Sequence, residues 1–189
     1  MKLSIRNMEF ARTSVSSWRN AAFVPEVGHA LAKWVKAKTG AVAPGILIGG
    51  LAMSFYAKPR YTEDIDLLFL EDHEVPKEVE GFKKHRLSAF EDREDNVEVE
   101  LVTATSIGIP QVVARKVIET AVEYDGIRVA SLEAMVVLKL YGSDNPRRLH
   151  HDMADVDRIL ENHPNVDLSG WLLTPKQKAR FVESYHRMT

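Results

Sequence analysis

Residues 46–70 read ILIGGLAMSFYAKPRYTEDIDLLFL, and this stretch decides the fold of the chain. It begins with the apolar run Ile46–Ile48, which predicts a short buried strand closed by two glycines. A short apolar segment from residue 51 to 56, expected to be helical, leads into a loop. The second strand is expected from residue 64 to 70, so the stretch predicts two strands joined through a glycine turn and a short helix.

Two carboxylates, Asp64 and Asp66, stand on the second predicted strand. Successive side chains of a strand point to opposite faces, so both carboxylates project the same way and repel each other. A cation usually offsets such repulsion, and Mg²⁺ prefers oxygen ligands and keeps room for water and substrate phosphates. The pattern indicates a magnesium site, and a solvated strand face is the alternative.

The glycine pair Gly49–Gly50 lies between an apolar strand and a short helix. Without side chains, these residues let the backbone approach a phosphate, which the N-terminus of a helix also favours. The sequence therefore indicates a phosphate-binding turn, and a merely tight turn is the alternative.

A third acidic strand is expected over residues 96–102, where Glu98 and Glu100 share one face. In a sheet, this strand can bring a carboxylate beside Asp64 and Asp66. That carboxylate would bind a second metal ion or take the proton of an attacking hydroxyl. Glu100 is the preferred candidate, whereas a solvated face is the stronger interpretation for Glu98.

The rest of the chain predicts mostly helices, with residues 77–90 compatible with either a helix or a strand. Helices are expected over residues 21–38, 111–124, 131–141 with Ser131 as N-cap, 147–161 and from 175 onward, and a short strand at 127–129. The class is therefore α+β, with a small mixed sheet flanked by helices and a helical C-terminal half. We expect residues 1–105 to form the core with the metal-binding sheet. Residues 106–189 should form a mainly helical lobe that completes the nucleotide cleft within one compact unit.

Lys139 lies in a segment that is apolar on nearly every side. A helix of this kind is buried all round, so its lysine must either reach out to water or meet an anion. The anion could be a nucleotide phosphate or the pair Asp152 and Asp155, which lie on one face of the next predicted helix. His150 and His151 are adjacent in that helix and are expected to point in different directions, which argues against a shared metal ion.

Composition excludes several classes of protein. The chain has 189 residues, no cysteine and a formal net charge of −2, which excludes disulfides and thiolate zinc sites and argues against a protein that coats nucleic acid. No apolar run approaches the length of a membrane span and no signal peptide is evident, so a cytoplasmic location is expected. Three basic runs, at residues 83–86, 147–148 and 176–180, are each either a solvated face or a phosphate contact, and a solvated face is the usual case.

These motifs together resemble the nucleotidyltransferases of the DNA polymerase β superfamily, which carry a hydrophobic strand, Gly-Gly or Gly-Ser, and then Asp-hydrophobic-Asp. The pattern Arg60-x-Thr62-x-Asp64-x-Asp66 is similar to the bacterial branch of the AbiEii and MenT toxins. The resemblance continues through Val99–Val102, where Glu100 stands in place of the usual aspartate. It then extends through Ser131–Ala134, Lys139–Leu140, Arg147–Arg148 and the pair Asp152 and Asp155.

The resemblance implies a nucleotidyltransferase fold and the transfer of a nucleoside monophosphate from a nucleoside triphosphate to a hydroxyl, with Mg²⁺ as cofactor. The implied acceptor is a tRNA 3′ end, in a toxin of a type IV toxin–antitoxin or phage-defence pair with a cognate antitoxin. Asp64, Asp66 and Glu100 would bind metal, and Lys139, Asp152 and Asp155 would be required for catalysis. Nucleotide would contact a further set, namely Gly49, Gly50, Ser54, Arg60 and Thr62. The alternatives are a nucleotidyltransferase acting on a small molecule such as an antibiotic, and a non-catalytic module that binds nucleotide or a partner.

Overall fold

The structure, a computed structural model, describes residues 25–37, 45–57, 62, 64–124 and 126–188. Its centre is a seven-stranded mixed sheet, within the described residues, with the strand order β3-β4-β5-β2-β1-β7-β6. The strands are β1 (Ile46–Ile48), β2 (Asp64–Phe69), β3 (Phe82–Arg86), β4 (Ala89–Asp92), β5 (Glu98–Thr103), β6 (Val122–Tyr124) and β7 (Ile127–Val129). The α+β class predicted from the sequence is confirmed.

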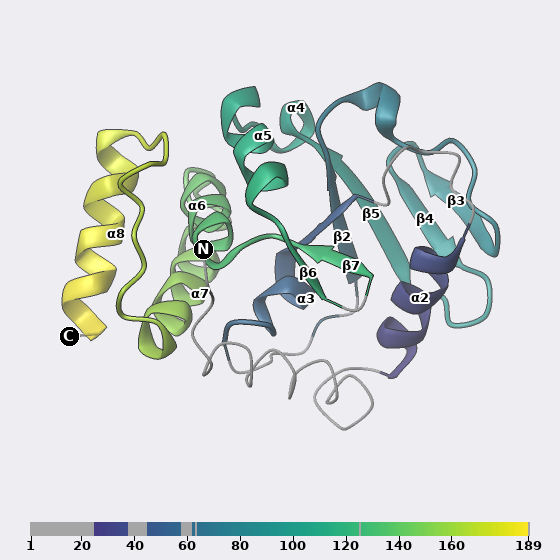
Figure 1. The fold of residues 1–189 in the computed structure, drawn as a ribbon, viewed down its shortest axis with the longest axis horizontal. Coiled ribbons are helices and arrows are strands. Elements are labelled where there is room, and N and C mark those ends of the chain that lie inside the picture. Colours follow the sequence, from purple (N-terminus) through teal and green to yellow (C-terminus); the bar gives the residue numbers. More distant parts are fainter. Residues whose placement is uncertain (1–24, 38–44, 58–61, 63, 125, 189) are drawn as a thin grey trace.

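Helices lie against the sheet and beyond one of its edges (Figure 1). The helix α2 lies near β3, β4 and β5, whereas α6, α7 and α8 gather at the opposite end. The helices are α2 (Pro25–Lys36), α3 (Gly49–Met53), α4 (Ala104–Ile107), α5 (Gln111–Thr120), α6 (Leu132–Gly142), α7 (Leu149–Asn162) and α8 (Pro175–Met188), with one 3₁₀ turn, η1 (Asp72–Glu74). Within the described residues, every helix is too short or too polar to cross a bilayer.

One face of the sheet forms the core with α2. Ile65, Leu67, Val99 and Leu101 alternate with polar neighbours along β2 and β5 and are almost fully buried. Trp34 of α2 packs its ring edge-on against the rings of Phe82 and Phe90, with centroids 5.2 and 5.9 Å away. Because apolar side chains occupy this face, the acidic side chains of β2 and β5 must project from the other.

Several local predictions are confirmed and others are refined. The strands at residues 46–48 and 127–129 form as expected, and Ser131 caps α6 by accepting a hydrogen bond from the Ala134 amide at 3.2 Å. Residues 77–90 contain strands instead of a helix, and α3 begins at Gly49 itself instead of at residue 51.

The predicted helix over residues 111–124 is wrong at its end, because α5 stops at Thr120 and residues 122–124 form β6. β6 pairs with β7 across Gly126, whose φ of 82° lies in the region that glycine adopts without strain. The β-prone residues before this turn satisfy their backbone groups in a hairpin, and this pairing prevails over helix continuation.

Candidate active site

The sheet brings three carboxylates together on its polar face. β2 and β5 run parallel with Asp66 opposite Glu100 and Asp64 opposite Glu98. Asp64 is exposed, whereas Asp66 and Glu100 are half-buried. Within the described residues, no lysine, arginine or histidine lies within ion-pair distance of Asp64, Asp66 or Glu100. The sheet therefore holds a concentrated negative charge that no cation of the described residues contacts directly.

The environment of Asp66 reflects this charge. Burial raises the pKa of its carboxyl to about 7, helped by the neighbouring charges of Asp64 and Glu100, while Lys139 and Arg148 act in the opposite sense. A carboxylate that is desolvated and crowded by like charges is stabilised by an added cation. The oxygen ligands and their crowding fit a divalent metal ion, and the three carboxylates are the residues that could hold it.

Gly49 is required next to Asp66. A Cβ atom at residue 49 would lie 1.7 Å from Asp66 Oδ2, and the φ of Gly49 is 69°. Only glycine combines that backbone conformation with so close an approach. The β1–α3 turn therefore presents its backbone directly beside the carboxylate.

The other predicted nucleotide-binding residues are placed differently. Thr62 is buried, and its Oγ1 donates a hydrogen bond of 2.8 Å to Asp64 Oδ1, which orients that carboxylate. Gly50 is buried in α3. Ser54 is also buried, and its hydroxyl donates to the Leu51 carbonyl at 2.6 Å, so it stabilises the end of α3. Arg60 lies outside the described residues.

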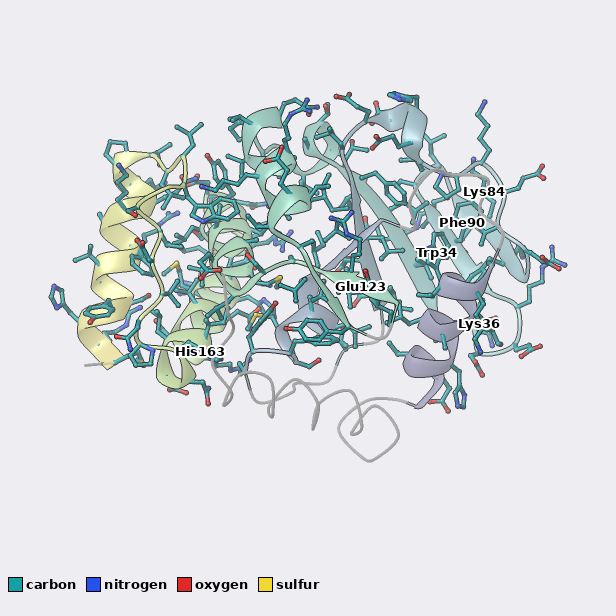
Figure 2. All side chains as sticks on the ribbon, in the orientation of Figure 1. Trp34, Lys36, Lys84, Phe90, Glu123 and His163 are labelled. Atoms are coloured by element: carbon teal, nitrogen blue, oxygen red, sulfur yellow. The ribbon has the colours of Figure 1, made fainter. Side chains whose placement is uncertain are left out.

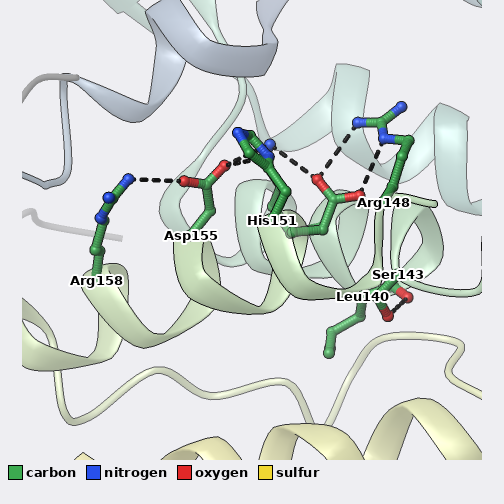
Figure 3. A network of polar contacts seen from close by, with 8 residues as sticks. Leu140, Ser143, Arg148, His151, Asp155 and Arg158 are labelled. Atoms are coloured by element: carbon green, nitrogen blue, oxygen red, sulfur yellow. Dashed lines mark hydrogen bonds and ion pairs between the residues drawn. The ribbon is translucent and has the colours of Figure 1, made fainter. Parts of the chain in front are cut away.

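A second charged cluster joins α6 to α7 (Figure 3). Lys139 is 5% exposed, and its Nζ lies 3.1 Å from Asp152 Oδ1 and 2.7 Å from Asp155 Oδ2. Both aspartates have no exposed surface. Of the alternatives left by the sequence, Lys139 meets the aspartate pair instead of reaching out to water. The lysine thereby links α6 to α7 through buried ion pairs.

Further cations flank this cluster on α7. Arg148 Nε lies 3.1 Å from Asp152 Oδ2, and Arg158 Nη1 lies 3.3 Å from Asp155 Oδ1. The sequence analysis placed Arg148 in a basic stretch of the resemblance and gave Arg158 no role, although their spacings of four and three residues from the aspartates are those of helical ion pairs.

The two adjacent histidines point in different directions, as predicted. His150 faces the groove between α7 and α8, whereas His151 Nδ1 lies 3.8 Å from Asp155 Oδ2. His151 does join Asp152 and Asp155 in a group with ligand atoms within 4.8 Å of one another. The Lys139 ammonium already lies between those aspartates, where it takes the place that a metal ion would need.

The helical cluster acts electrostatically on the sheet carboxylates. Lys139 and Arg148 both lower the pKa of Asp66 electrostatically, so their positive charges act on the sheet carboxylates. α3, which begins at Gly49, also contacts α6. The candidate site therefore combines the carboxylates of β2 and β5 with the electrostatic effect of Lys139 and Arg148, which are themselves paired with aspartates of α7.

A nucleotidyltransferase is the class that this fold and this site define. Residues 42–129 match the family model described as nucleotidyl transferase AbiEii toxin, type IV toxin–antitoxin system. The matched segment holds the glycine turn and all three sheet carboxylates, and it ends before α6 and α7. A search of curated proteins finds no match. The family implies nucleotidyl transfer in a toxin–antitoxin context, with a nucleotide substrate, an antitoxin partner and the divalent metal typical of such enzymes.

Proposed function

We propose that the protein transfers a nucleoside monophosphate from a nucleoside triphosphate to the 3′ hydroxyl of an RNA, of the tRNA class, with Mg²⁺ as cofactor. The observation that carries this proposal is the half-buried Asp66 between Asp64 and Glu100, with its pKa raised to about 7. Such a trio is costly without a cation and is suited to one that also binds phosphate oxygens. The reaction requires triphosphates, which agrees with the cytoplasmic location expected from the sequence.

The metal would be held by Asp64, Asp66 and Glu100, and when bound it would neutralise the phosphate oxygens and orient the attacking and leaving oxygens. Thr62 keeps Asp64 oriented through its hydrogen bond. Gly49 brings the backbone directly beside Asp66, and Gly50 remains a candidate for phosphate binding through its place in the sequence motif. Arg60 remains a candidate for nucleotide binding through its place in the sequence motif.

In the transfer itself, the acceptor hydroxyl forms a bond to the α-phosphorus and pyrophosphate leaves. Positioning and charge stabilisation supply most of the catalysis in phosphoryl transfer. The hydroxyl proton needs an acceptor, and we assign Glu100, because it faces the same side as Asp66 and lies on the adjacent strand.

Lys139 of α6 would help to neutralise the negative charge of the triphosphate. Lys139 is positioned by Asp152 and Asp155, and its charge acts on Asp66 from across the site. We assign the two aspartates to positioning, since both are buried and both contact the lysine. In this division of roles, residues 1–105 supply the metal site and residues 106–189 complete the nucleotide cleft.

The test is transfer of label from α-labelled nucleoside triphosphates to unfractionated bacterial tRNA by the purified full chain with Mg²⁺. Asp66→Ala should lower the rate by at least about a thousandfold, because the loss of several kcal/mol of charge stabilisation is expected when a metal site is removed. Asp157→Ala, an α7 substitution on the side that contacts Arg187, is the matched control and should retain the rate. Equal transfer by Asp66→Ala and the wild-type protein would refute the assignment.

Two other functions remain testable in the same assay. Transfer to an aminoglycoside or another small hydroxyl compound, with none to RNA, would indicate a small-molecule enzyme. Calorimetric binding of a triphosphate with Mg²⁺ but no transfer to any acceptor would indicate a binding module.

A further inference from the structure

The polar face of the sheet continues beyond the carboxylates to a free edge of the described sheet. Glu98 of β5 is opposite Glu91 of β4, and Glu91 is opposite Lys83 of β3. Because residues paired in register share a face, Lys83 projects on the same side as Asp64 and Asp66. We name this surface the carboxylate face, formed by Asp64, Asp66, Glu91, Glu98, Glu100 and Lys83.

The charge of the carboxylate face changes sign from its centre to its edge. Arg86 Nη2 binds both carboxylate oxygens of Glu98 at 2.5 and 2.7 Å, and His85 Nδ1 lies 3.0 Å from Glu91 Oε2. Arg86 thus pairs with Glu98, and the His85 ring contacts Glu91. Lys83 is exposed and takes part in no ion pair within the described part of the chain, so it adds positive charge at the edge.

The opposite side of β3 has a different environment. Lys84 is opposite Phe90, and Phe82 and Phe90 pack against Trp34 of α2. Figure 2 shows Lys84, Phe90 and Trp34 in succession from the edge strand toward α2. Lys83 and Lys84 are therefore adjacent exposed lysines of one strand that lie on opposite faces of the sheet.

The span of the face indicates the size of its ligand. β3 is separated from β2 by three strand spacings, which is about 14 Å at the usual interstrand distance. A small acceptor bound at Asp66 would not extend that far. A nucleic acid strand carries a phosphate at every nucleotide, so one with its 3′ end at the carboxylates can place upstream phosphates over β3.

We propose that the carboxylate face is the path of the RNA acceptor, with the 3′ hydroxyl beside Asp66 and Glu100 and the upstream phosphates held over β3 by Lys83. Arg86 offsets the charge of the Glu98 carboxylate, which would otherwise repel the strand along this path, and the His85 ring lies against Glu91. This inference rests on the proposed function and adds to it the direction from which the acceptor enters.

The test compares Lys83→Glu with Lys84→Glu in transfer to unfractionated bacterial tRNA. Lys83→Glu should raise the KM for tRNA about five- to tenfold and lessen its salt dependence, as expected when a phosphate contact is lost. The KM for the triphosphate should stay the same. Lys84→Glu makes the same charge change on the other face and should alter the KM for tRNA less than about twofold.

If the two substitutions raised the KM for tRNA equally, the effect would reflect nonspecific electrostatic attraction between protein and RNA. The proposed path of the RNA would then be overturned. A changed KM for the triphosphate in Lys83→Glu would also overturn it. If Lys83→Glu left tRNA transfer unchanged but weakened inhibition by the antitoxin, the face would belong to a protein partner instead. If the wild-type protein transfers to no RNA, the proposal that RNA is the acceptor is refuted. If the wild-type protein transfers to tRNA and Lys83→Glu has the same KM for tRNA, only the proposed path of the RNA is refuted.

Discussion

Two acidic clusters of the molecule look alike in sequence and differ in their surroundings. Asp64 and Asp66 lie on a strand beside Glu100, and none of these carboxylates contacts a cation within the described residues. Asp152 and Asp155 lie on α7 and share the ammonium of Lys139. The first cluster is left with its repulsion, whereas the second is neutralised from within the chain.

The difference separates a ligand-binding cluster from a positioning cluster. Buried charges destabilise a fold unless they are paired, so the α7 aspartates are maintained by Lys139, with Arg148 and Arg158 at their outer sides. The repulsion in the sheet would be relieved further by an added cation or proton. Functional binding of metal is therefore expected at the sheet, and structural stability is expected to depend on α6 and α7.

The largest effect on stability should follow from removing Lys139 from its ion pairs with Asp152 and Asp155. Lys139→Met keeps the length of the side chain but leaves Asp152 and Asp155 buried without their shared cation. Removing one partner of a buried ion pair usually costs about 3–5 kcal/mol, so the free energy of unfolding should fall by that amount in urea titrations. Adding Asp155→Asn to Lys139→Met should recover part of the loss, since one buried charge is removed.

The matched control is Arg187→Met, which breaks the more exposed pair with Asp157 of the same helix. Exposed pairs contribute about 0–1 kcal/mol, so this variant should remain close to the wild-type protein. If Lys139→Met and Arg187→Met had equal costs, Lys139 would not be the cation that maintains the cluster.

A comparison within β5 should sharpen the assignment of the third carboxylate. Glu100→Gln should lower kcat about a hundredfold, as expected when a proton acceptor or metal ligand is lost. Glu98→Gln should change kcat less than about threefold, because Arg86 already binds the Glu98 carboxylate. Glu98 is assigned neither as a metal ligand nor as a proton acceptor. A larger effect of Glu98→Gln would exchange the roles of the two residues.

Much of the site could be predicted because its determinants are local. Alternation along a strand places Asp64 and Asp66 on one face, and the glycine pair marks the turn that approaches them. The apolar surroundings of Lys139 predicted burial and allowed an aspartate partner, and the structure contains that contact. The part of the fold that rests on periodicity and capping, such as α6 with its Ser131 cap, was predicted for the same reason.

The remaining features depend on contacts between distant segments. The sequence does not reveal that β2 and β5 are parallel and in register, although this pairing sets Glu100 beside Asp66. Val122–Tyr124 continues a helical pattern and becomes a strand because β7 is available to pair with it. Ser54 followed the glycine turn in sequence, yet its hydroxyl bonds to the backbone of α3. Tertiary pairing decides each of these cases.

The smallest expected effect is on the pH dependence of stability, because burial and neighbouring carboxylates disfavour the ionised form of Asp66. The pKa of Asp66 is raised from 3.8 to about 7, so its protonated form is favoured in the folded state. Stability that is complete below pH 3.8 is then lost as the pH rises toward 7. Asp66→Asn is always neutral, so it should be more stable than the metal-free wild-type protein by about 1–3 kcal/mol at pH 8, and equal to it near pH 4. Mg²⁺ should stabilise the wild-type protein more than the variant in thermal unfolding. If Asp66→Asn were less stable than the wild-type protein at both pH values, the charge of Asp66 would be stabilised within the folded protein. The contrast between the sheet cluster and the α7 cluster would then be wrong.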